Sequence, residues 1–212
     1  MWGLKSEHMT NELIWNEKDR ERSYFKNSMN RCKCLITLSQ YMKDHWKSIF
    51  PELNIVNLYH PVAKTQHVFN LEKFKSNKHV RCLGTWGRNY TVWDELKTDY
   101  SKSSSRDNYL SHDEYHLMFT DTVIFLDVED ASANNAVVEC IQRNTPILTR
   151  NHPAIIEYLG ADYPLYFETL EQASSLLSNI DNVIQAHRYL QQMDKQHIQI
   201  ETFLHNLSNI NI

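Results

Sequence analysis

The stretch TVIFLDVEDASANNAVVECIQRNTPILT, residues 122–149, decides the fold class of this chain. It opens with a wholly apolar run and continues through small and polar residues. It then places apolar residues at helical spacing up to about Arg143, and strand-forming residues follow at 145–149. Apolar strands without alternation are typical of buried parallel sheets, and strand, helix and strand in succession make a right-handed βαβ unit. The stretch therefore predicts an α/β fold.

The same alternation of strands and helices continues on both sides of this unit. We expect helices at 12–31, 40–50, 111–119, 153–159 and about 181–208, and strands at 34–38, 54–59 and 79–83. Residues 98–111 are polar and rich in serine, which predicts a surface loop or a locally disordered segment. These elements together predict a Rossmann-like parallel sheet flanked by helices.

Four segments are expected along the chain. Residues 1–62 form a first unit, and the polar residues 63–78, which show no clear period, are the best candidate for a linker. Residues 79–180 form the second unit, and residues 181–212 form a C-terminal helix. The first unit is short for a complete domain, because domains usually need about 100 residues or more.

Composition excludes several classes of protein. The 212 residues are 42% hydrophobic and 23% charged with a net charge of −4, so we expect no nucleic-acid binding through a broadly basic surface. No apolar run approaches the ~20 residues of a membrane span. The N-terminus does not have the pattern of a signal peptide, so the cytoplasm is the expected compartment. The four cysteines lack a second pair or a nearby histidine that would complete a zinc set, so we expect no metal site.

The loop after the strand at 79–83 is the first candidate site. It contains Gly84, Thr85, Trp86 and Arg88. Glycine lets the backbone approach a phosphate closely, Arg88 can bind a phosphate with two hydrogen bonds, and Trp86 offers a stacking face. The competing interpretation is an ordinary strand-to-helix turn with a packed Trp and an exposed Arg.

The second candidate site precedes the helix of the opening stretch. Ser132, Asn134 and Asn135 are three good capping residues where one would suffice. The free N–H groups and positive dipole end of a helix N-terminus favour an anion, although asparagine also suits turns. Glu139, one turn further on, lies on the polar side of this helix and can bind a ligand or simply pair with Arg143 at i,i+4.

These residues resemble the donor-binding domain of GT-B type glycosyltransferases. The pattern is carried by residues 127–141, 144–148 and 157–160, and it is similar to glycosyltransferase-like proteins of large DNA viruses and some bacteria. Residues 34–39 and 59–61 resemble the end of the first domain of the family, and residues 83–89 resemble its donor loop. The resemblance implies a GT-B-like second domain, a truncated first domain, and a nucleotide-diphosphate sugar as donor substrate without a metal or other cofactor.

The resemblance also implies roles for individual residues. Arg88 would neutralise the diphosphate in catalysis, and Glu139 would hold the ribose hydroxyls. Gly84, Thr85 and Trp86 would line the donor loop, while Ser132, Asn134 and Asn135 would hold phosphate or sugar. Donors preorganised in this way stabilise charge that develops on a leaving nucleoside diphosphate.

The sequence leaves three functional hypotheses. The leading hypothesis is a glycosyltransferase, or a fragment of one, that moves a sugar to a glycan or protein acceptor. The alternative is a non-catalytic nucleotide-binding or protein-interaction module on the same fold, because fold alone does not fix function. Another nucleotide-dependent α/β enzyme, such as an epimerase, is the third.

Overall fold

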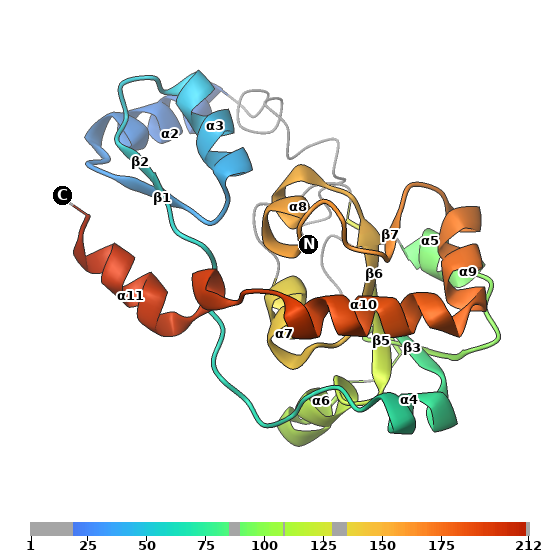
Figure 1. The fold of residues 1–212 in the computed structure, drawn as a ribbon. Helices are drawn as coiled ribbons and strands as arrows, with labels where there is room; N and C mark the ends of the chain where they lie inside the picture. Colours follow the sequence, from blue (N-terminus) through green and yellow to red (C-terminus); the bar gives the residue numbers. More distant parts are fainter. Residues whose placement is uncertain (1–18, 85–89, 108, 129–134, 211–212) are drawn as a thin grey trace.

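The computed structural model describes residues 19–84, 90–107, 109–128 and 135–210, and it has an α/β architecture. Its described part contains a two-stranded sheet near the N-terminus and a five-stranded sheet that forms the body of the molecule (Figure 1). Both sheets are parallel throughout. The predicted Rossmann-like sheet flanked by helices is confirmed.

The five-stranded sheet is doubly wound. In chain order its strands are β3 (His79–Cys82), β4 (Ser101–Ser104), β5 (Thr122–Leu126), β6 (Ile147–Arg150) and β7 (Tyr166–Phe167). They lie side by side in the order β4-β3-β5-β6-β7, so the direction of winding reverses between β3 and β5. In such sheets, ligands bind beyond the carboxyl ends of the strands at that switch point.

Helices cover both faces of this sheet. Their bounds are α5 (Tyr90–Glu95), α6 (His112–Met118), α7 (Asn135–Arg143), α8 (Pro153–Leu159) and α9 (Leu170–Ser178). Right-handed crossovers put α5 on one face and α6, α7 and α8 on the other, because β4 and β6 lie on opposite sides of the switch point. Trp93 of α5 packs against Phe125 of β5 with ring centroids 5.4 Å apart. Every residue of β5 is buried, as its apolar run predicted.

The N-terminal unit is a small βαβ arrangement. It consists of α2 (Asp19–Arg31), β1 (Leu35–Thr37), α3 (Gln40–Ile49) and β2 (Ile55–Asn57). The Ser39 side chain accepts a hydrogen bond from the backbone N–H of Met42 and caps α3, as the sequence predicted. Phe25 of α2 packs on Trp46 of α3 at 5.9 Å between centroids.

Two stretches differ from the sequence interpretation. Residues 63–78 contain the helix α4 (Leu71–Asn77), capped by the Asn70 side chain, and its Phe74 is fully buried in the main core. Residues 101–104, predicted as part of a loop, form the edge strand β4. A strand needs only backbone pairing to its neighbour, and β4 pairs with β3 along its whole length. Its serine side chains also bond to β3, since Ser101 Oγ lies 2.7 Å from His79 Nδ1 and Ser103 Oγ accepts from Arg81 Nη1 at 2.9 Å.

The predicted helix at 181–208 is in fact interrupted. The structure has α10 (Ile180–Gln192), a 3-10 turn (Gln196–Ile198) and α11 (Ile200–Ser208). The Asp194 carboxylate accepts a hydrogen bond from Gln196 N, and Val62 N donates to Ile198 O. These contacts replace helical hydrogen bonds and redirect the chain toward the N-terminal unit (Figure 1). None of the described helices has the length and apolar character of a membrane span.

Candidate functional site

The site lies at the carboxyl ends of β3, β5 and β6. The registers pair Cys82 with Phe125 and Leu126 with Thr149. Continuing these registers past the strand ends sets Gly84, Asp127 and Arg150 in one row, with neighbouring strands about 4.8 Å apart. The row crosses the switch point, and α7, which follows β5 in the chain, begins at Asn135.

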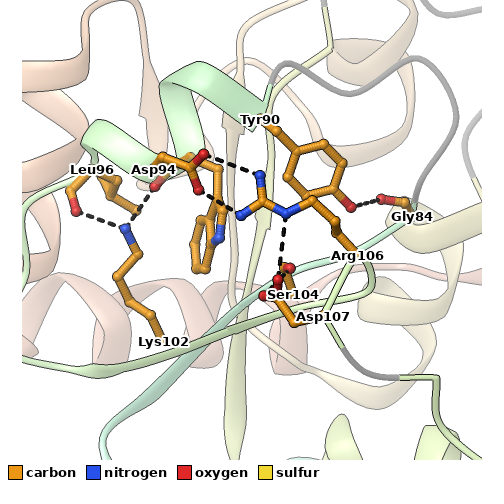
Figure 2. A network of polar contacts seen from close by, with 9 residues as sticks. Gly84, Tyr90, Asp94, Leu96, Lys102, Ser104, Arg106 and Asp107 are labelled. Atoms are coloured by element: carbon orange, nitrogen blue, oxygen red, sulfur yellow. Dashed lines mark hydrogen bonds and ion pairs between the residues drawn. The ribbon is translucent and has the colours of Figure 1, made fainter.

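A polar network fixes the β3–β4 side of this edge (Figure 2). Arg106, just after β4, donates two hydrogen bonds to the Asp94 carboxylate, at 3.0 and 2.8 Å. Its guanidinium carbon lies 4.7 Å from the ring centroid of Tyr90, and the Tyr90 hydroxyl donates to Gly84 O at 2.7 Å. Gly84 itself has a φ of 88°, a conformation that glycine adopts without strain.

The charges of this network are mutually satisfied. The hydrogen bond to Asp94 raises the pKa of Arg106, and the same bond lowers the pKa of Asp94. A hydrogen bond donated by the Ser104 hydroxyl lowers the pKa of Asp107. All these groups therefore stay ionised at neutral pH. The paired Arg106 packs on Tyr90, whose hydroxyl binds Gly84 O and so fixes the backbone that follows β3.

Arg81 is a buried cation beneath this edge that sequence analysis missed. It lies within β3 and is only 4% exposed. Its guanidinium donates to Ser103 Oγ at 2.9 Å and to Ser104 O at 3.1 Å. Burial lowers the pKa of Arg81, while Asp107 opposes the shift. The available signal was a single arginine inside the apolar run of residues 80–83.

Asp127 and Arg150 lie on the β5–β6 side of this edge. Asp127 is 2% exposed, and its Oδ1 accepts a hydrogen bond from Arg150 Nε. The Arg150 Nη1 atom donates to Glu168 O at 2.8 Å, and the guanidinium carbon lies 5.2 Å from the ring centroid of Phe167. Within the described ranges, Asp127 Oδ2 has no hydrogen-bond partner. Sequence analysis did not single out either residue.

Five of the predicted site residues lie outside the described residues, namely Thr85, Trp86, Arg88, Ser132 and Asn134. Gly84 lies at the carboxyl end of β3, at the switch point. Asn135 is the exposed first residue of α7. The structure thus brings two of the predicted residues to the same edge of the sheet.

Glu139 makes the contact that the competing interpretation predicted. Its carboxylate accepts a hydrogen bond from Arg143 Nη1, and its side chain is 22% exposed. Arg143 itself is 2% exposed, and its guanidinium carbon lies 4.8 Å from the ring centroid of Phe119. Since α7 runs away from the carboxyl edge, this pair lies further from the row than Asn135 does.

A histidine cluster stands beside this ion pair, and sequence analysis missed it. His112 and His116 of α6 have ring centroids 4.5 Å apart, and His67 stacks on His116 at 5.7 Å. His116 Nδ1 accepts from Arg143 Nη2 at 2.8 Å, since arginine only donates. Burial, and then the positive charge of Arg143, lower the pKa of His116. The HxxxH spacing of His112 and His116 was the unused signal.

No group of three or more metal-ligating side chains suited to a metal ion occurs among the residues that the structure describes. In the histidine cluster, one nitrogen of His116 is already engaged by Arg143. The four cysteines, which all lie in the described part of the chain, form no disulfide; Cys82 and Cys140 are buried, and Cys32 and Cys34 are half-buried.

The N-terminal unit joins the main sheet through α8. Glu157 accepts hydrogen bonds from the backbone N–H groups of Gln40 and Tyr41, each at 2.6 Å. Its carboxylate therefore occupies the N-terminus of α3, where the helix dipole favours negative charge. The buried Tyr158 hydroxyl donates to Leu38 O and accepts from His60 N at 2.9 Å. The carboxyl ends of β1 and β2 are thus held against α8.

Neither a family model nor a curated protein matches this sequence.

Proposed function

We propose that this chain is a glycosyltransferase, or a part of one, that binds a nucleotide-diphosphate sugar at the carboxyl edge of its five-stranded sheet. The acceptor is a glycan or a glycoprotein, and the chemistry needs no metal. Four cysteines that form no disulfide suit a reducing compartment, and we propose the cytoplasm.

The observation that carries the proposal is the switch point between β3 and β5. The order β4-β3-β5-β6-β7 puts the switch point at these two carboxyl ends, and doubly wound sheets bind their ligands at that point. Gly84, in a left-handed conformation, lies on one side of it and the start of α7 lies on the other. The first N–H groups of a helix lack intrahelical partners and favour phosphate. The resemblance of residues 127–160 to donor-binding domains supports a nucleotide sugar as the ligand.

The paired charges at the edge bear on where phosphate charge is neutralised. Arg106 and Arg150 are each bound to a carboxylate, so they offer little free positive charge to a diphosphate. We assign that role to Arg88, together with the N-terminus of α7. Donors held in place before the reaction stabilise the leaving nucleoside diphosphate without reorganisation.

Isothermal titration calorimetry tests the proposal. The purified chain is titrated with UDP, GDP, dTDP and their sugars, and the measurement is repeated on Arg88→Ala and Asn135→Ala. We expect saturable binding of one diphosphate, weakened tenfold or more by Arg88→Ala, which corresponds to about 1.4 kcal/mol.

The matched control is Arg188→Ala. Arg188 is exposed on α10, so this variant changes the net charge equally without touching the edge of the sheet. If both arginine variants weaken nucleotide binding equally, the effect comes from the net charge of the chain and not from a contact of Arg88 with the diphosphate. A folded chain that binds none of the nucleotides would overturn the proposed function.

A further inference from the structure

Asp127 is a buried carboxylate, and one of its two oxygens has no hydrogen-bond partner among the described residues. Its side chain is 2% exposed, and Arg150 Nε binds Oδ1, while no residue in the described part of the chain binds Oδ2. An ionised carboxylate accepts through both oxygens, and buried polar groups in native proteins almost always have a partner. The Oδ2 atom is therefore an acceptor whose hydrogen-bonding capacity the described residues leave unmet.

The place of Asp127 in the sheet connects this atom with the candidate site. Asp127 directly follows β5, and the continued register puts it between Gly84 and Arg150. Side chains alternate along a strand, so Asp127 projects to the same face as Phe125, which α5 covers through Trp93. Gly84 contributes no side chain to the row. The unpartnered oxygen thus lies beside the switch point.

Arg150 fixes the orientation of the carboxylate. Its Nε binds Asp127 Oδ1, its Nη1 binds Glu168 O, and its guanidinium packs on the Phe167 ring. With these contacts the plane of the Asp127 carboxylate is set before any ligand arrives. A preorganised acceptor of this kind gives specificity for a donor group.

The chemistry of the site determines which kind of hydrogen-bond donor group it can bind. A phosphate oxygen is excluded because two anions would meet in a buried place. A hydroxyl supplies an O–H donor without introducing a charge. In a nucleotide sugar, the hydroxyl groups that flank the diphosphate belong to the ribose and to the transferred sugar.

We propose that Asp127 Oδ2 accepts a hydrogen bond from a hydroxyl of the bound nucleotide sugar and that Asp127 is therefore a specificity-determining residue. This inference rests on the proposed function. A site built to hydrogen-bond a hydroxyl strongly rejects the analogue that lacks it, because its own polar group is then left unpaired. The sources of the hydroxyl, ribose or sugar, are separated by the ligands used in the test.

The test compares Asp127→Asn with the wild type by calorimetry. The ligands are the nucleotide sugar that the wild type binds, the corresponding nucleoside diphosphate, its 2′-deoxyribose form and the single-deoxy forms of the sugar. We expect Asp127→Asn to bind the nucleotide sugar at least tenfold more weakly. The matched control is Asp99→Asn, an exposed position at the opposite edge of the sheet, for which we expect less than a twofold change.

Each result decides between the alternatives. A loss that is already present with the nucleoside diphosphate assigns the ribose, and a loss confined to the nucleotide sugar assigns the sugar. In either case the analogue without the bonded hydroxyl should bind wild type and variant equally. An Asp127→Asn variant that keeps its melting temperature and binds every ligand within twofold of the wild type would overturn this inference but leave the proposed function intact.

Two further outcomes are also decisive. If Asp127→Asn does not fold, the affinities of the wild type for the deoxy analogues decide the question. A tenfold weaker affinity for one deoxy analogue supports the inference, and unchanged affinity for all of them overturns it. If the wild type binds no nucleotide at all, the proposed function fails and this inference fails with it.

Discussion

Replacing Tyr158 by phenylalanine tests how firmly the N-terminal unit is attached to the main sheet. Tyr158 is 1% exposed, and its hydroxyl bridges Leu38 O and His60 N. Phenylalanine fills the same space but leaves both backbone groups without this partner. A buried polar group that loses its partner costs about 1–3 kcal/mol. Because both contacts are only partly buried, we expect the low end for each, or about 2 kcal/mol in total.

Thermal and urea denaturation measure this loss. For a chain of this size, 1 kcal/mol shifts the melting temperature by about 2–4 °C, so Tyr158→Phe should lower it by about 4–8 °C. Hydrogen exchange at His60 N should accelerate in parallel. The control Tyr109→Phe removes a hydroxyl from a residue that is 96% exposed and should change nothing. A Tyr158→Phe variant within about 0.5 kcal/mol of the wild type would refute the bridging role of the hydroxyl.

Three other predictions concern stability. Glu157→Gln removes the charge at the N-terminus of α3 and should cost about 1 kcal/mol in urea denaturation, whereas Glu95→Gln, an exposed control, should be neutral. Gly160→Ala should cost more than about 1 kcal/mol, because φ is 82° and the new Cβ would collide with the Tyr189 hydroxyl; an unchanged melting temperature would contradict this. Burial lowers the pKa of four histidines below their usual 6.5, so the folded state binds fewer protons than the unfolded chain near that pH. The stabilisation that comes from this difference should be complete above about pH 6.5 and should be lost as the pH drops through the lowered pKa values. A urea midpoint that is constant from pH 7.5 to 5 would exclude this contribution. The four are His79, His116, His187 and His197.

Local patterns predicted those elements that local physics determines. The apolar run of β5 and the cap at Ser39 needed no information from distant residues, and both are confirmed. The edge strand β4 was missed because its serines carry no apolar signal and only backbone pairing with β3 makes it a strand. The end of α10 was missed for a related reason: the pairing of Val62 with Gln199 joins positions far apart in the sequence.

The candidate site shows a sharper division between what sequence can and cannot predict. A glycine at a strand end and an asparagine at a helix start are positional signals, and Gly84 and Asn135 do lie at the carboxyl edge. Charge pairing has no such signal when the partners come from different strands. Asp127 and Arg150 are 23 residues apart, and only the register of β5 on β6 makes them neighbours. Pairing within one helix is local, which is why the contact of Glu139 with Arg143 could be foreseen. The residues whose partners are set by sheet register, Asp127 above all, are therefore the ones where the structure adds most to the functional argument.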